Sequence, residues 1–422
     1  MKAVWLCLLG ILVSTAASLS AETGKNAFSR WKNLPQDENF FPIGVWVQAP
    51  SDAGKYKELG INFYFGLWKG PTAEQIQELK KHGMGVVCHF NEYAKENLLN
   101  EPAVWGWMHS DEPDLALHFP RELLKGPGGK EIIKKHWPEI YTQLDLDRNE
   151  YNGWGMGLHP VNDIQSGYQE IKKNDLKRPV FIQLSMAVAN EGIEMGRGDR
   201  SGKIWEYPLY MEGSDVVSFD IYPVAYGNPD KLWQISKGID QLKAWGSGDR
   251  PRMVILEAGF GEVWASKHQQ RAQLWLAINH GAQGIAWFAH RWIKENGQEK
   301  FYSARMPLQH PEVGQAIKEL NLEVLSLASV INAEKPGNIA AAKGIELDLG
   351  ARKKDDILYL FAVERGGKSG LAEITLNGID RAEIEVLGEN RTLTCTGGVF
   401  KDDFEPWAVH LYKIHNQSVS GY

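Results

Sequence analysis

Cysteine is scarce in this 422-residue chain, and there is no excess of positive charge. It has three cysteines, and the two beyond the first few residues, Cys88 and Cys395, lie too far apart in sequence to suggest the disulfide framework of a small secreted domain. Acidic residues number 53 against 46 lysines and arginines, which gives a formal net charge of −7. Because a nucleic-acid partner requires a basic surface, this balance argues against one.

The chain also lacks the short motifs of several common enzyme classes. It has no His-Glu-x-x-His helix, no Gly-x-Ser-x-Gly elbow and no Gly-rich phosphate loop after a strand. Candidate metal ligands occur without the spacing that a metal site needs, namely His82, His89, His109 and Asp111. We therefore expect neither a metal nor a cofactor, and a metal-dependent barrel hydrolase is only an alternative.

The N-terminus has the pattern of an export signal. Lys2 supplies a positive charge, Val4 to Val13 form a short apolar run, and small residues follow at 14–18. The run is too short to span a bilayer as a permanent helix, although an uncleaved anchor is the alternative. We expect residues 1–21 to be a signal peptide, and the mature protein to be secreted or periplasmic with no membrane partner.

Short apolar runs alternate with amphipathic stretches from residue 42 onward, which is typical of β-α units around a parallel sheet. Each run is nearly continuous in apolar residues, as expected for strands buried on both faces. The runs are Ile43–Val47, Asn62–Leu67, Gly85–Phe90, Val104–His109, Val180–Leu184, Val216–Ile221, Met253–Leu256 and Gly284–Phe288. They predict the α/β class and a (β/α)8 TIM barrel over residues 22–335.

Helix-spaced stretches fill the gaps between these runs. Several end at or near a glycine, which readily adopts the left-handed conformation that ends a helix, and Thr72 is placed as an N-cap. The expected helices are 53–59, 72–82, 162–173, 203–211, 230–245, 267–279 and 312–327.

The composition changes after Val330. Short strand patterns separated by Gly, Asp and Asn turns follow at Ile345–Leu349, Ile357–Val363, Leu371–Leu376, Ala382–Val386 and Val409–Ile414. This spacing predicts a small C-terminal antiparallel β-sandwich over residues 336–422. The long aromatic stretch Leu115–His159 follows the fourth barrel strand, where we expect it to border a substrate cleft; a surface insertion is the alternative.

Two glutamates stand at the carboxyl ends of predicted barrel strands, where the active sites of such barrels lie. Glu112 follows the fourth strand and Glu257 ends the seventh. Cleavage of a glycosidic bond requires one carboxyl group that donates a proton and a second that stays ionised, and in retaining enzymes the two lie about 5–5.5 Å apart. We expect these side chains to face each other across the barrel mouth and to act on a carbohydrate.

The segment Asp111-Glu112-Pro113, together with Glu257, resembles the superfamily of barrel glycoside hydrolases with catalytic Glu residues on strands four and seven (clan A-like). This resemblance implies that Glu112 is the acid/base and Glu257 the nucleophile of a retaining double displacement. Asp111 stands where the family usually has an Asn that holds a sugar hydroxyl. An ionised Asp could accept a hydrogen bond from that hydroxyl but could not donate one.

The resemblance extends to two further positions. Tyr222 matches the Tyr after strand six that bonds the nucleophile, and Trp287 matches the Trp that forms a sugar platform. The Arg often found near strand two is absent, and Trp68 follows that strand instead. Other residues at strand ends are expected to contact the sugar, namely Trp46, His89, Asn91, His290 and Arg291.

Each of these assignments has an alternative. Any Trp can fill the core, Glu112 can open a helix, and Glu257 can form a buried salt bridge. Asp111 can share the acid role with Glu112. The whole barrel can also be a catalytically inactive carbohydrate-binding protein, because a fold does not guarantee chemistry.

Overall fold

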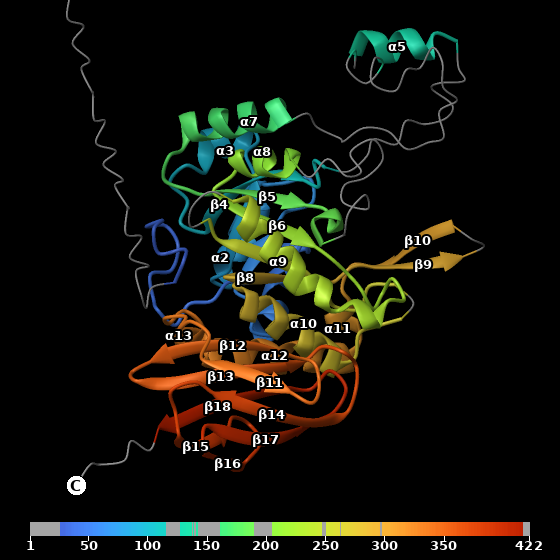
Figure 1. Cartoon of the computed structure of the whole chain (residues 1–422). Coiled ribbons are helices and arrows are strands. Elements are labelled where there is room, and N and C mark those ends of the chain that lie inside the picture. The colour runs from blue at the N-terminus through green and yellow to red at the C-terminus, as the bar shows by residue number, and fades with distance from the viewer. Residues whose placement is uncertain are drawn as a thin grey trace, which may run out of the picture.

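The computed structural model describes residues 26–114, 127–136, 138, 141, 161–189, 205–246, 250–261, 263–295 and 298–416. The expected signal peptide at residues 1–21 lies outside the described residues, as does most of the aromatic stretch at 115–159. Figure 1 shows a barrel surrounded by helices and, packed against it, a second body made of strands.

Eight parallel strands close into a barrel, in which β1 pairs with both β2 and β8. The strands are β1 (Ile43–Trp46), β2 (Phe63–Phe65), β3 (Gly85–His89), β4 (Val104–Asp111), β5 (Val180–Leu184), β6 (Val216–Asp220), β7 (Arg252–Glu257) and β8 (Gly284–Phe288). Every predicted barrel strand is present, with small shifts at the ends, so the predicted TIM barrel is confirmed.

Side chains of the barrel strands alternate between two apolar layers. On β7, Val254 and Leu256 belong to the cluster that includes the surrounding helices, whereas Met253 and Ile255 belong to the barrel interior. Phe28, from the segment before β1, joins the interior cluster. Because both faces of each strand are buried, their sequences are nearly continuous in apolar residues.

Helices cover the outside of the barrel, and several carry the expected end signals. The Thr72 hydroxyl accepts a hydrogen bond from the backbone N–H of Gln75, whose side chain accepts one from the backbone N–H of Thr72 in return. Gly281 ends a helix with a φ of 105°. The α-helices are α1 (Ala53–Glu58), α2 (Ala73–Lys81), α3 (Glu92–Asn97), α5 (Gly129–His136), α7 (Val161–Asn174), α8 (Glu206–Glu212), α9 (Trp233–Trp245), α10 (Lys267–His280), α11 (Met306–Gln309), α12 (Pro311–Ser326) and α13 (Ala328–Ile331), and the short 3-10 turns are η1 (Pro50–Asp52), η2 (Met186–Ala189) and η5 (Pro229–Lys231). None of the described helices is both long and apolar enough to cross a membrane.

An antiparallel hairpin follows the last barrel strand. It consists of β9 (Arg291–Glu295) and β10 (Gln298–Ser303), and Figure 1 shows it projecting away from the barrel. This hairpin was not predicted from the sequence, because its strands mix charged and aromatic residues without the apolar runs of the barrel strands.

The C-terminal part is an eight-stranded antiparallel sheet, which confirms the predicted sandwich. The sheet has its own buried core, which includes Leu360, Ile374 and Phe400. Its strands are β11 (Ala340–Lys343), β12 (Leu347–Lys354), β13 (Ile357–Glu364), β14 (Gly370–Leu376), β15 (Arg381–Val386), β16 (Arg391–Thr396), β17 (Val399–Phe404) and β18 (Val409–Asn416), in the order β11-β14-β17-β16-β15-β18-β13-β12.

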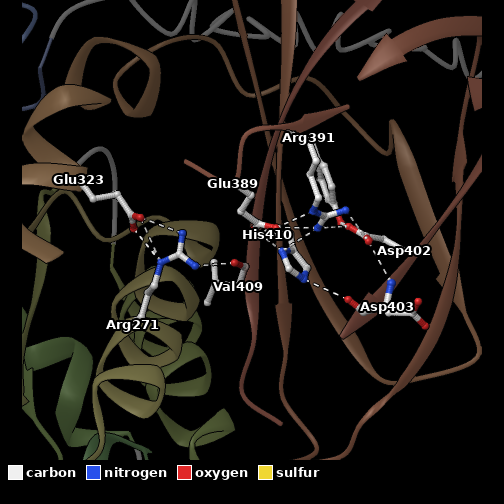
Figure 2. A network of polar contacts seen from close by, with 9 residues as sticks. Arg271, Glu323, Glu389, Arg391, Asp402, Asp403, Val409 and His410 are labelled. Carbon is white, nitrogen blue, oxygen red and sulfur yellow. Dashed lines mark hydrogen bonds and ion pairs between the residues drawn. The ribbon is translucent and has the colours of Figure 1, made fainter. Parts of the chain in front are cut away.

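The sandwich packs on the helix layer of the barrel. The ring of Trp275 on α10 contacts that of Phe361 on β13, with centroids 4.7 Å apart. Arg271 pairs with Glu323 of α12 and donates to the carbonyl of Val409 at 2.5 Å (Figure 2). Phe361 and Val409 both belong to the same buried cluster as the barrel helices, so the two parts share a core.

A polar network lies within the sandwich itself. The Arg391 guanidinium donates to both carboxylate oxygens of Asp402, at 2.7 and 2.8 Å, and also pairs with Glu389, which contacts His410 (Figure 2). The Tyr412 hydroxyl donates to Asp402 at 2.8 Å. Asp402 is thus buried with its charge fully paired, which an acid inside a small core requires.

Candidate active site

A cleft of about 260 Å³ opens at the carboxyl ends of the barrel strands, where enzymes of this fold build their active sites. Three acids, Asp111, Glu112 and Asp220, line it. The other lining residues are mostly aromatic or polar and are Trp46, Gln183, Met186, Tyr222, Tyr226, Ile255, Phe260, Phe288 and Trp292.

A β-bulge in β4 aims Asp111 into the cleft. β4 pairs with β5 in register at Met108 and Phe181, and the register then shifts so that Asp111 pairs with Gln183. Phe181 faces the barrel interior, and Gln183, two residues further along β5, lines the cleft. Because a bulge re-aims the side chains that follow it, Asp111 shares the inward direction of Gln183.

Glu112 enters the cleft through an unusual backbone conformation. Its φ is 44°, in the left-handed region that residues with a side chain rarely adopt. Its N–H donates to the Gln183 carbonyl at 2.7 Å, which holds this turn against β5. Strain of this kind at a non-glycine residue is concentrated at functional sites, because elsewhere it only costs stability.

Asp111 holds its proton more tightly than an ordinary aspartate. Asp111 is exposed to solvent, but it lies in the cleft, where the surrounding protein displaces part of the water around its carboxyl group. Desolvation is the largest cause, followed by the negative charges of Asp220 and Asp114, and together they raise the pKa of Asp111 to about 7. At neutral pH the cleft therefore contains a carboxyl group that can donate a hydrogen bond.

Asp220 ends β6 and is the hydrogen-bond partner of Tyr222, which follows it by two residues. The ring of Tyr222 is almost fully buried. Burial, the charge of Asp220 and this hydrogen bond all raise the pKa of Tyr222 well above its usual value, and the charge of Glu112 acts in the same direction. Tyr222 therefore stays protonated and can donate to an ionised Asp220.

Glu257 ends β7 as predicted, but it is not among the residues that line the cleft. It is 1% exposed, and three donors occupy its carboxylate. Oε1 accepts from the Val224 N–H at 3.1 Å and from Gln273 Nε2 at 2.7 Å, and Oε2 accepts from the Ala225 N–H at 2.8 Å. Burial raises its pKa to about 7, although these hydrogen bonds oppose the rise.

This placement does not fit the role that the sequence analysis expected of Glu257. A nucleophile must present a free oxygen to the substrate, whereas both oxygens of Glu257 hold the loop after β6. Glu112 and Glu257 were expected to face each other across the barrel mouth. The acids that line the cleft together are instead Asp111, Glu112 and Asp220.

Trp287 is also turned away from the cleft. Its side chain is fully buried, and its indole N–H donates to Asn321 Oδ1 of α12 at 2.8 Å. The next residue, Phe288, lines the cleft instead. Trp287 therefore does not face the cleft, where a sugar platform was expected, because successive residues of a strand face opposite sides.

Two of the expected sugar contacts have structural partners instead. Asn91 caps α3, where its Oδ1 accepts from the Ala94 N–H at 2.9 Å. Arg291 donates from Nε to the Gly261 carbonyl at 3.1 Å, and its guanidinium lies over the ring of Trp264. Neither residue lines the cleft.

The remaining expected contacts lie at or near the rim. His290 lies behind Trp46, whose carbonyl is 3.1 Å from His290 Nε2, and burial lowers the pKa of this imidazole. His89 ends β3 with an exposed side chain, and Trp68 beyond β2 is 73% exposed. Of the residues expected to bind sugar, the cleft brings together Trp46, Asp111 and Tyr222 with the expected acid Glu112.

Four acidic or aromatic residues of the cleft were not predicted from the sequence, namely Asp220, Tyr226, Phe260 and Phe288. Asp220 could have been found, because it is a carboxylate at the end of an apolar strand, as Glu257 is. Tyr226 and Phe260 lie in loops, where no strand pattern indicates their direction, whereas Phe288 ends the predicted strand β8 beside Trp287, which was chosen instead. Among the described residues, no group of three or more His, Cys, Asp or Glu is arranged to hold a metal ion.

No protein-family model matches the chain, and no curated protein matches it. Solved structures that are similar to this chain were found. A catalytic mutant of a GH42 β-galactosidase from G. stearothermophilus is similar with a TM-score of 0.56 and 8% identity, over 89% of this chain and 98% of that one. An α-amylase from Anoxybacillus is similar with a TM-score of 0.52 and 9% identity, over 91% of this chain and all of that one. At these identities the likeness is one of fold, so the chain has a barrel fold that is also found in glycoside hydrolases of two kinds.

Proposed function

We propose that this protein is a glycoside hydrolase whose reacting carboxyl groups come from β4 and β6. In this proposal Glu112 is the acid/base, as the sequence pattern indicates, and Asp220 is the nucleophile in place of Glu257. The observation that carries the proposal is the convergence of Asp111, Glu112 and Asp220 on one aromatic-lined cleft at the carboxyl end of the barrel.

The reaction is a double displacement. Ionised Asp220 attacks the anomeric carbon, and a carboxylate–sugar ester forms as the glycosidic bond breaks. Glu112 gives its proton to the departing oxygen. In the second step Glu112 removes a proton from water, the water oxygen attacks the same carbon, and Asp220 leaves as a carboxylate. The hydrogen bond from Tyr222 supports this role for Asp220, because it stabilises the ionised form.

Asp111 in this proposal binds a sugar hydroxyl near the reacting carbon. An Asn at this position would both donate and accept a hydrogen bond, and a protonated Asp can do the same. The raised pKa of Asp111, about 7, supports such a role at neutral and mildly acidic pH. The substitution of Asp for the usual Asn is then compatible with the same contact.

The walls of the cleft suit a sugar. Trp46, Tyr222 and Phe288 offer flat apolar faces, while Gln183 offers an amide for hydroxyl groups. The fold likeness to an amylase and a β-galactosidase is consistent with a carbohydrate substrate. We also propose that residues 1–21 direct export, so that the enzyme meets its substrate outside the cytoplasm.

Two variants test the proposed function on a panel of nitrophenyl glycosides and polysaccharides. Glu112→Gln and Asp220→Asn should each lower kcat/KM by about 10³-fold or more while the protein stays folded, because each removes one of the two essential carboxyl groups. Asp230→Asn, at an exposed acid of η5 outside the cleft, is the matched control and should retain full activity.

The outcomes separate the proposal from its alternatives. Undiminished turnover in Asp220→Asn would overturn the assignment of the nucleophile. Sugar binding by the unaltered protein without turnover of any substrate would instead identify a catalytically inactive carbohydrate-binding barrel.

A further inference from the structure

The hairpin β9–β10 begins three residues after the cleft residue Phe288 and carries aromatic side chains outward from the cleft. Trp292 on β9 and Phe301 on β10 are directly opposite each other in the antiparallel pair. Cross-strand partners point to the same face of a hairpin, so these two rings form one surface.

The rings of this surface continue those of the cleft without a break. Phe288 and Trp292 are stacked, with centroids 5.7 Å apart and an interplanar angle of 19°. Phe260 contacts Trp292 at 5.8 Å, and Trp292 contacts Phe301 at 5.3 Å in an edge arrangement. The chain of rings therefore runs from the floor of the cleft to Phe301, which is 51% exposed.

The other face of the hairpin holds it in place. Tyr302 follows Phe301 directly and faces the opposite side of the strand, as successive strand residues do. The guanidinium of Arg291 lies over both Tyr302, at 4.9 Å, and Trp264, at 4.7 Å, and Arg291 also donates to the Gly261 carbonyl. The base of the hairpin is thereby fixed against the loop after β7, which gives the Trp292–Phe301 surface a defined position.

We infer that the Trp292–Phe301 surface binds a further sugar ring of a carbohydrate chain that extends out of the cleft. The inference rests on the proposed function and adds that the substrate is an oligo- or polysaccharide rather than a single glycoside. A solvent-exposed aromatic ring next to a closed cleft offers a sugar the same apolar face that the cleft walls offer. Because the surface is preorganised, binding there orders few side chains.

The test uses Phe301→Ala, with Trp205→Ala at the start of α8 as the matched control. Both rings are exposed, at 51% and 63%, but only Phe301 lies on the proposed binding face. We expect Phe301→Ala to lower kcat/KM about tenfold on gluco- and galacto-oligosaccharides and to leave nitrophenyl monosaccharides unaffected, because only a chain reaches the hairpin. Trp205→Ala should keep the parent's higher kcat/KM on oligosaccharides, because its ring lies outside the hairpin and the cleft. Unchanged circular dichroism spectra would show that both variants fold.

Calorimetric titration with the same oligosaccharides keeps this inference separate from the proposed function. The inference is supported if the affinity of the unaltered protein rises with oligosaccharide length and that of Phe301→Ala does not. This result would support sugar binding by the hairpin surface even if no substrate is cleaved. Affinity that does not depend on chain length, or a dependence that Phe301→Ala leaves intact, would overturn the inference while leaving the catalytic proposal in place.

Discussion

Asp111 illustrates how one residue departs from a familiar pattern and still fits the site. Its carboxyl group is surrounded by the protein and by the charges of Asp220 and Asp114, so it retains a proton that an exposed aspartate would lose. The pattern of the sequence indicated a functional residue at this position. The bulge in β4 and the acid Asp220 at the end of β6, two strands away, became visible only with the fold.

The variant Asp111→Asn tests the hydrogen-bonding role. With a pKa of about 7, Asp111 is neutral below that pH and ionised above it, so the donor is lost as the pH rises through 7. An Asn is a donor at every pH. We expect the fall of kcat/KM near pH 7 to disappear in the variant, with activity at pH 5 within about tenfold of the parent.

A full pH–rate profile of both proteins measures this. If the variant loses as much activity as Glu112→Gln at every pH, Asp111 takes part in proton transfer, and its role as a hydroxyl contact is contradicted.

The contrast between Glu112 and Glu257 shows the limit of reasoning from single residues. Both follow apolar strands, and the position of each at a strand end was predicted correctly. What the sequence could not indicate is direction, because the left-handed turn at Glu112 and the backbone N–H groups of Val224 and Ala225 around Glu257 depend on tertiary contacts.

The loop after β6 is the element that Glu257 organises. Val224 and Ala225, which donate to its carboxylate, lie between Tyr222 and Tyr226, and both tyrosines line the cleft. We expect Glu257 to be a positioning residue that fixes this loop from beneath. Its deep burial is then no obstacle, because it need not touch the substrate.

The variant Glu257→Gln should alter stability and its pH dependence more than catalysis. A Gln offers only one acceptor oxygen, so one loop N–H loses its partner at a cost of about 1–3 kcal/mol. In the parent, the pKa of Glu257 rises to about 7 on folding, so its contribution to stability is fully present below its unfolded pKa and is lost as the pH rises through 7. The variant should lack this decline.

Urea unfolding at pH 5 and pH 8 checks the expected free energies, with Glu58→Gln on the exposed surface of α1 as control. We expect kcat/KM of Glu257→Gln to fall far less than that of Asp220→Asn. A complete loss of turnover with native stability would instead restore Glu257 as the nucleophile.

Whether the other strands could be predicted depended on the strength of their sequence patterns. The barrel strands and the strand Ile357–Glu364 were predicted because their apolar residues are nearly continuous. The strands Arg391–Thr396 and Val399–Phe404 were not, because polar residues dominate their exposed faces and Gly397–Gly398 separates them in a tight turn. The hairpin after β8 was missed for the same reason, and with it the aromatic surface that extends the cleft.

At the scale of the whole molecule, the barrel and the sandwich have different roles. The sandwich packs on α10 and α12 through Trp275, Arg271 and Glu323, and none of its described residues lines the cleft. Closure of the barrel gathers the ends of β1, β4, β5, β6, β7 and β8 around one hollow, so acids far apart in sequence lie close in space. The count of strands predicted this closure, but the orientation of Asp111 in the hollow follows from the register shift in β4, which the sequence does not indicate.

Covalent labelling of the sugar–enzyme intermediate is the most direct test of the central claim. A panel of activated fluorosugars, which slow the second step of a double displacement, would trap the ester, and mass spectrometry of the digested protein would locate it. We predict that the label is carried by the carboxylate of Asp220. A label on Glu257 would contradict the account, because it would mean that the buried, fully hydrogen-bonded acid of β7 reaches the substrate after all.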